Sequence, residues 1–176
     1  MNADKIRMFY FGYGSNMCTG RLRARVPSTI AIGKCFLRRN RFRLNKKSTD
    51  RFGDSAKGNI EETNIETDIV WGVLFEFDAA EKHLLDEAEA LGHGYNETLV
   101  RIEFESGETQ DDVSAYIADP EHIDNNLQPY SWYKRFITEG ARQHDLPAAY
   151  IQFLENFPAQ EDPDRGRDRK NRAIGC

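Results

Sequence analysis

The sequence predicts an α+β fold with a mostly antiparallel sheet or barrel. The chain has 176 residues, about the length of one domain, and no Pro/Gly/Ser-rich linker divides it. Segments typical of strands dominate its middle, and two segments typical of helices lie near its end. Strands and helices that are grouped in this way, rather than alternating, favour α+β over a parallel α/β fold.

The first half of the chain is predicted to be mainly strand. Residues 8–11 form a short β-prone run that ends at Gly12, and residues 17–25 are expected to form a short helix. Residues 29–43 contain alternating and β-branched stretches, which indicate one or two strands. Two further strands are expected at 59–63, where few residues are apolar, and at 68–77, the most clearly buried strand of the sequence.

The second half begins with a helix at 79–90, and the Asp78 carboxylate is placed to cap its free first-turn amides. Residues 95–105 alternate as a strand does, and residues 112–117 indicate another strand. Two helices are then predicted at 132–144 and 147–156. Pro147 suits the first turn of the second helix, since the amide that proline lacks has no partner there.

Composition excludes several broad classes. Lys and Arg number 24 against 29 Asp and Glu, and the net charge of −5 argues against general nucleic-acid binding. No apolar run approaches the roughly 18 residues that span a bilayer, and the first residues lack a signal-peptide core. The number of cysteines is odd, and none of them has CxxC spacing: they are Cys18, Cys35 and Cys176. We therefore expect a reduced, cytoplasmic protein with neither a disulfide scaffold nor a metal site.

Charge is distributed unevenly along the chain. Residues 21–47 are strongly basic and contain Phe36 and Phe42, so they could form a nucleic-acid surface with stacking aromatic residues. The alternative is that the basic residues are the outward positions of strands whose apolar partners face the core. Residues 159–176 are polar and rich in Asp and Arg, which predicts a mobile tail.

A small-residue turn follows the first strand, where residues 9–17 read FYFGYGSNM. Free backbone amides at the start of a helix can cradle an anion, and glycines let the backbone approach it. A dinucleotide site would need a third glycine at Met17, and a nucleophile elbow would need glycines on both sides of Ser15, so neither pattern fits. A ligand-binding loop and a plain tight turn both remain open.

Three carboxylates, Asp86, Glu87 and Glu89, lie near the end of the predicted 79–90 helix. The carbonyls of a helix C-terminus carry partial negative charge, which raises the pKa of a nearby carboxyl group, as burial also would. A general base that works near neutral pH needs such a pKa. A solvated acidic face is the alternative, and on a helix Asp86 and Glu89 share a face while Glu87 points elsewhere.

These segments together resemble the γ-glutamylcyclotransferase family. The loop FGYGSNM at 11–17 is similar to the family's YGSN loop, and LDEAE at 85–89 is similar to its LDExE segment. Between them, DIVWGVL at 68–74 resembles the family's VWGV strand, and residues 132–150 resemble its closing helices. Because four blocks occur in the right order over residues 7–157, the chain is identified as a member of this family.

The resemblance implies a small mixed, mostly antiparallel β-barrel with surrounding α-helices at 1–158, followed by the tail at 159–176. It also implies an enzyme that converts a γ-glutamyl compound to 5-oxoproline and releases the attached amine or amino acid. Glu89 takes the position of the catalytic carboxylate, which would act as base and then as acid. The substrate-binding positions that carry over are Tyr13, Gly14, Ser15, Asn16, Tyr95 and Tyr116.

Partners and specificity follow from the same resemblance. The α-amine of the substrate attacks its own γ-carbonyl, so we expect no cofactor, no metal and no enzyme nucleophile. The expected partner is a small γ-glutamyl molecule, with no nucleic acid and no membrane, and both a monomer and a homodimer stay open. The leaving group stays open between an amino acid, an amine and a larger metabolite. The alternative is a cavity protein that binds such a ligand without turnover.

Overall fold

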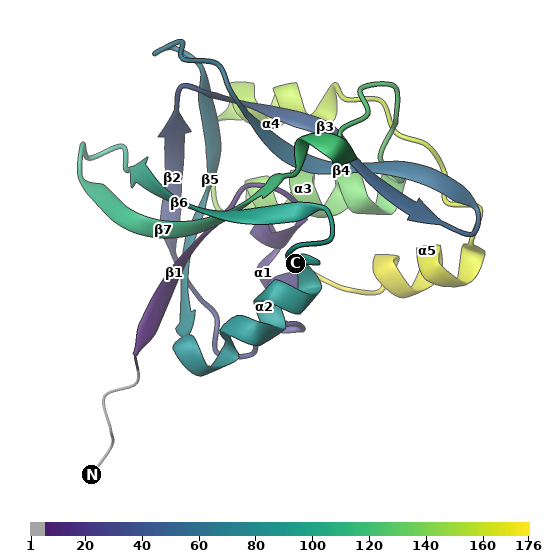
Figure 1. Ribbon diagram of the computed structural model, residues 1–176, viewed down its shortest axis with the longest axis horizontal. Coiled ribbons are helices and arrows are strands. Elements are labelled where there is room, and N and C mark those ends of the chain that lie inside the picture. Colours follow the sequence, from purple (N-terminus) through teal and green to yellow (C-terminus); the bar gives the residue numbers. More distant parts are fainter. Residues whose placement is uncertain (1–5) are drawn as a thin grey trace.

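The computed structural model describes residues 6–176, which form a closed five-stranded barrel, a two-stranded sheet beside it and surrounding helices (Figure 1). The strands are β1 (Arg7–Gly12), β2 (Ile30–Arg38), β3 (Asn40–Asp50), β4 (Gly53–Glu62), β5 (Ile69–Asp78), β6 (Tyr95–Glu103) and β7 (Thr109–Ala118). The helices are η1 (Ser15–Met17), α1 (Thr19–Arg23), η2 (Ala79–Glu81), α2 (Lys82–Ala88), η3 (Pro120–His122), α3 (Ser131–Gln143), α4 (Ala148–Glu155) and α5 (Arg165–Arg172).

The barrel confirms the predicted mixed, mostly antiparallel sheet. Its strands follow the order β1-β5-β2-β6-β7, and all neighbours are antiparallel except β1 and β7, which close the barrel in parallel at Tyr10 and Ser114. β5 pairs with both β1 and β2, and six consecutive residues of it are buried. A strand that is covered on both faces reads as a continuous apolar run, which is why its sequence was the clearest strand signal.

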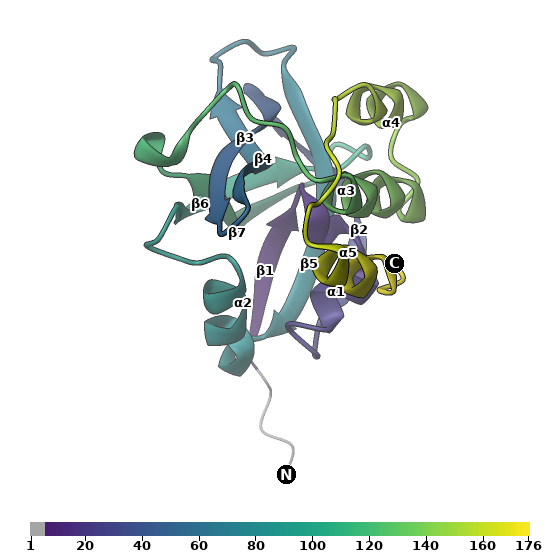
Figure 2. The same cartoon turned by 90° about the vertical axis from the view of Figure 1, so that its right-hand side faces the viewer.

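Helices cover the barrel on two sides. Figure 2 shows α1, α3, α4 and α5 together on one side and α2 apart from them. α3 packs directly beneath the turn after β1, because Gly140 presents no side chain there: an added Cβ would lie 2.5 Å from the Cys18 amide nitrogen and 2.6 Å from the Met17 carbonyl carbon. This close approach fixes the position of η1 against a rigid helix.

The cap at Asp78 is also confirmed. Its carboxylate accepts a hydrogen bond of 3.0 Å from the Ala80 amide, at the start of the short η2 helix that leads into α2. Satisfying a free first-turn amide in this way stabilises the start of the helical segment. The cap thereby fixes the beginning of the segment whose far end carries Glu89.

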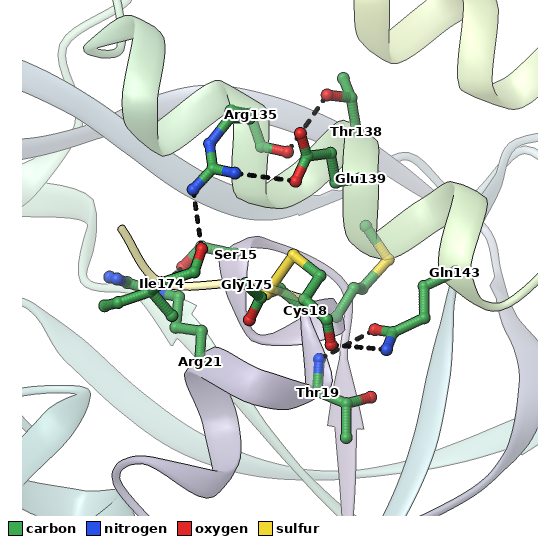
Figure 3. Close-up of a disulfide and its surroundings, with 12 residues drawn as sticks. Ser15, Cys18, Thr19, Arg21, Arg135, Thr138, Glu139, Gln143, Ile174 and Gly175 are labelled. Carbon is green, nitrogen blue, oxygen red and sulfur yellow. Dashed lines mark hydrogen bonds and ion pairs between the residues drawn. A yellow bond between two sulfur atoms is a disulfide. The ribbon is translucent and has the colours of Figure 1, made fainter. Parts of the chain in front are cut away.

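One sequence expectation was wrong: the cysteines are not all reduced. Cys18 and Cys176 form a disulfide, and Cys35 is free and buried. The two bonded residues are 158 positions apart, so local sequence spacing holds no sign of the pair. Figure 3 shows the bond next to α3, from which Gln143 donates a 2.6 Å hydrogen bond to the Cys176 carbonyl.

Residues 159–176, which composition led us to expect as a mobile tail, contribute helix α5 and are fastened to the body. Asp162 is buried, and its carboxylate accepts hydrogen bonds from the Trp132 indole at 2.7 Å and from Arg167 at 2.6 Å. Asp164 caps α5 by accepting from two of its first amides. The polar residues of this segment are therefore partners in long-range contacts, a role that composition alone does not distinguish from solvation.

Candidate active site

The loop between β1 and α1 forms one wall of a hollow in the barrel. Ser15 and Asn16 are buried, and η1 is closed by hydrogen bonds from the Met17 amide to the Gly14 carbonyl and from the Cys18 amide to the Ser15 carbonyl. Of the backbone hydrogen bonds outside regular helices and strands within residues 6–176, none has the amide of Gly14, Ser15 or Asn16 as donor. These amides are thus available to an anionic oxygen.

Glu89 lies opposite this loop, at the C-cap of α2. Its side chain is 15% exposed and accepts a 2.6 Å hydrogen bond from the side-chain nitrogen Nδ2 of Asn16, and Arg25 lies 3.6 Å from the same oxygen. Burial raises the pKa of the Glu89 carboxyl above its ordinary value, while Arg25 and Asn16 act in the opposite direction. A carboxylate with a raised pKa and a fixed orientation is suited to taking and returning a proton.

The other two carboxylates of this segment do not line the hollow. Asp86 accepts a 2.5 Å hydrogen bond from the Tyr116 hydroxyl and pairs with Lys82, and Glu87 is exposed. Of the three carboxylates, only Glu89 faces the hollow, because α2 ends at this residue, opposite the loop.

Tyrosines line most of the remaining wall of this first hollow, whose free space of about 280 Å³ is partly open to solvent. Its lining residues are Tyr10, Tyr13, Gly14, Ser15, Asn16, Gly58, Glu89, Tyr95, Tyr116 and Tyr133. The structure therefore brings together all seven residues that the sequence singled out. Burial is the main cause that raises the pKa of the Tyr10, Tyr13 and Tyr95 hydroxyls, so they stay neutral near pH 7 and can donate hydrogen bonds.

Sequence reasoning missed Tyr10, Gly58 and Tyr133. Tyr10 lies in β1, three positions before Tyr13, and strand alternation does not place residues with this separation on one face. Tyr133 comes from α3, and its hydroxyl accepts a 2.9 Å hydrogen bond from the Gly58 amide. This pair joins segments that are 75 positions apart, and no local pattern indicates such a contact.

Glu89 also lines a second hollow, which has about 500 Å³ of free space that is partly open to solvent. Ser15, Glu89, Tyr95 and Tyr133 line both hollows, so the two are adjoining. The second hollow carries four basic side chains and a single carboxylate, that of Glu89. The basic residues are Arg21, Arg25, Lys46 and Lys57.

The two aromatic residues considered for stacking in a nucleic-acid surface at residues 21–47 are not accessible. Phe36 and Phe42 are buried, so neither can stack on a base. Arg41 and Arg43 point outward and pair with acidic neighbours, as the alternative predicted. Within residues 6–176, no cluster of His, Cys, Asp and Glu could hold a metal ion, and no helix is long and apolar enough to cross a bilayer.

Comparisons with known proteins show the family and the fold of this chain. Residues 69–154 match the AIG2-like family. The human protein named gamma-glutamylcyclotransferase is 30% identical over 162 residues, covering 86% of this chain and 79% of the human one, and the mouse protein of that name is 27% identical with the same coverage. A solved structure described as gamma-glutamyl cyclotransferase superposes with a TM-score of 0.79 at 22% identity, over 95% of this chain and 99% of the other. A yeast gamma-glutamyl cyclotransferase specific to glutathione has the same fold at a TM-score of 0.64 and 12% identity, over 84% of this chain and 93% of the other.

Proposed function

Because this chain belongs to the gamma-glutamylcyclotransferase family, we propose that it converts a γ-glutamyl amino acid or γ-glutamyl amine to 5-oxoproline and the free amino acid or amine, with Glu89 as general base and acid. The observation that carries this proposal is the Glu89 carboxylate, held by Asn16 in a tyrosine-lined hollow. Family membership supports the general activity. The residue roles carry over from the family resemblance, and the geometry supports them.

The proposed reaction is an intramolecular exchange of one amide for another. The α-amine of the glutamyl group attacks its γ-carbonyl carbon and closes a five-membered lactam, and the bond from that carbon to the leaving nitrogen breaks. The α-amine is an ammonium ion at neutral pH, so a base must first remove a proton from it. The ammonium nitrogen loses two protons as it becomes the lactam N–H. Glu89 takes each proton in turn and passes both to the leaving nitrogen, which departs as an ammonium ion. No water is consumed, because the attacking nitrogen replaces the leaving nitrogen on the carbonyl carbon.

Proximity supplies a second part of the rate enhancement. A γ-glutamyl chain must fold back on itself to bring its amine against its carbonyl, and a site that holds this conformation removes much of the entropic barrier. We assign the holding of the glutamyl end to the loop residues Tyr13, Gly14, Ser15 and Asn16. The free amides of this loop favour an anionic oxygen of the substrate, either its α-carboxylate or the oxyanion that forms during attack.

Two further tyrosines complete the proposed pocket. The Tyr95 hydroxyl donates a 2.5 Å hydrogen bond to the Gly58 carbonyl, and Tyr13 donates to the Tyr116 carbonyl. Tyr116 in turn donates to Asp86. These bonds join β4, β6 and β7 to the loop, so we assign Tyr95 and Tyr116 to shaping the pocket around the folded substrate.

Release of 5-oxoproline tests the proposal directly. Wild type should release it from at least one of a γ-glutamyl dipeptide, a γ-glutamyl amine and glutathione, and Glu89→Gln should lower the rate by about 100-fold or more. Glu87→Gln is the matched control, since this neighbouring carboxylate is exposed and should leave the rate unchanged. Activity that survives Glu89→Gln would move the base to another residue. No turnover of any compound, together with binding of 5-oxoproline, would favour a cavity protein without catalysis.

A further inference from the structure

The second hollow has far more positive than negative charge. Arg21, Arg25, Lys46 and Lys57 face it, and Glu89 is its one carboxylate. Like charges that are gathered in a partly buried space repel one another and lose solvation. A ligand with negative charge would relieve this repulsion.

The two arginines already have partners within the protein. Arg21 donates hydrogen bonds of 3.3 Å to the Ser15 hydroxyl and to the side-chain oxygen Oδ1 of Asn171. Arg25 donates to Asn16 at 3.1 Å and lies 3.6 Å from Glu89. Both guanidinium groups therefore support the loop and the proposed base, and the single carboxylate of the hollow is taken up by this network.

The two lysines are in a different position. Lys46 on β3 and Lys57 on β4 are direct cross-strand partners, a register in which two like charges are unfavourable. Among residues 6–176, neither ammonium forms a hydrogen bond, and neither has a carboxylate oxygen within 4.0 Å. Lys57 stacks over the Tyr133 ring at 4.2 Å, and Lys46 over the Tyr95 ring at 4.9 Å.

Burial also acts on these lysines. Lys46 is 8% exposed, and desolvation lowers its pKa. Desolvation is the main cause that lowers the pKa of Lys57 to about 7, and the neighbouring cations add to it. Both ammonium groups would gain from a negative charge brought into the hollow.

The position of Glu89 indicates which part of a substrate reaches this hollow. Under the proposed function, the scissile bond lies at Glu89, and the first hollow takes the glutamyl group. A leaving group that extends past Glu89 can then enter the second hollow, which shares Ser15, Tyr95 and Tyr133 with the first.

We propose that the second hollow is the leaving-group subsite and that Lys46 and Lys57 select a leaving group with two carboxylates, an acidic amino acid. One lysine binds the α-carboxylate of the leaving amino acid, and the other binds its side-chain carboxylate. This inference rests on the proposed function and adds the substrate class to it. An amine without a carboxylate leaves both lysines unpaired and is the poorest substrate.

Three substrates of graded charge test the proposal: γ-glutamylglutamate, γ-glutamylglutamine and γ-glutamylbutylamine. The first two differ by one charge at nearly constant size. Wild type should show a kcat/KM for γ-glutamylglutamate at least about tenfold above that for γ-glutamylglutamine, with the amine lowest, because a charge-assisted hydrogen bond is lost at each step. Raised ionic strength should reduce the preference.

The variants Lys46→Met and Lys57→Met should each bring the ratio of the two kcat/KM values toward one, and the double variant should abolish the preference. Since the ratio is taken within one protein, a loss of folded material does not change it. Lys47→Met is the matched control, because Lys47 neighbours Lys46 but pairs with Asp54 at 2.9 Å, and its ratio should equal that of wild type.

Two results would overturn the inference alone: a wild-type ratio near one, or a preference that persists in the double variant. Turnover of none of the three compounds would refute the proposed function, and the inference would fall with it. Failure of the inference is distinguishable from failure of the proposed function, because only in the former case does the protein still release 5-oxoproline.

Discussion

Lys57→Met should make the protein more stable, although Lys57 lines the proposed substrate cavity. The lysine is held in the fold without a carboxylate partner, and burial together with neighbouring cations lowers its pKa to about 7. In the unfolded chain its pKa returns to about 10.5, so the unfolded state binds the proton more tightly. Folding below pH 7 therefore places an unpaired charge in the hollow, which methionine of similar length avoids.

The size of this effect follows from the two pKa values. The difference between 10.5 and about 7 corresponds to about 5 kcal/mol, at about 1.36 kcal/mol for each pKa unit. Methionine loses the cation–π contacts with Trp132 at 4.6 Å and Tyr133 at 4.2 Å, which together contribute about 1–2 kcal/mol. The expected gain at pH 6 is therefore about 3 kcal/mol, equivalent to a rise in Tm of about 10 °C for a chain of this size.

The pH dependence gives the sharper test. Between pH 7 and 10.5 the unfolded state carries a proton on Lys57 that the folded state lacks, so wild-type stability rises with pH over this window. The advantage of Lys57→Met should be fully present below pH 7 and nearly absent above pH 10.

Urea unfolding at pH 6, 7, 9 and 10 measures this difference for wild type, Lys57→Met and the control Lys47→Met. Lys47 pairs with Asp54, which raises its pKa, so it stays charged across the range and its variant should show no such trend. A Lys57→Met protein that is no more stable than wild type at pH 6 would refute the reasoning. A gain that is equal at pH 6 and pH 10 would refute its electrostatic cause.

Three further substitutions have defined outcomes. Cys176→Ser breaks a disulfide that closes a 158-residue separation, so it should lower the free energy of unfolding by about 2–5 kcal/mol, and thermal unfolding of reduced wild type should match the variant. Gly140→Ala places a methyl group against the Met17 backbone, so it should destabilise the protein by about 1–3 kcal/mol in urea unfolding, although alanine has the better helix propensity. The variant should also lose 5-oxoproline release. A neutral effect would mean that α3 does not support the loop. Arg25→Met removes a cation that lowers the pKa of Glu89, so the acidic limb of the kcat/KM profile should move to higher pH, and an unchanged limb would exclude Glu89 as the titrating base.

Local sequence patterns predicted the parts of the fold and site that depend on neighbouring residues. The apolar run of β5 indicated a buried strand, and Asp78 caps the helical segment as expected. The loop at 13–16 and Glu89 were found because each lies in a short, recognisable segment. Their meeting across the hollow, through the 2.6 Å Asn16–Glu89 hydrogen bond, required the closed barrel.

Contacts between residues that are distant in the chain could not be predicted from the sequence, for a physical reason. The Cys18–Cys176 bond and the Tyr133–Gly58 hydrogen bond depend on how α3 and the final segment pack, and neither leaves a periodic pattern in the chain. The mobile-tail expectation came from polar composition. The same polar residues, such as Asp162, are partners in buried hydrogen bonds once the fold brings Trp132 to them.

The basic residues of β3 show how a local rule can fail at a functional position. Arg41 and Arg43 alternate outward, as expected for a half-buried strand, while Phe42 and Leu44 face the core. The β3–β4 register then shifts between Leu44 and Lys46, so the alternation is interrupted: Asn45 and Lys46 are both buried, and Lys46 lies opposite Lys57. A sequence that needed only stability would have an apolar residue at this inward position. The charge there opposes folding, so it is best explained by a negatively charged ligand that is absent from the sequence itself.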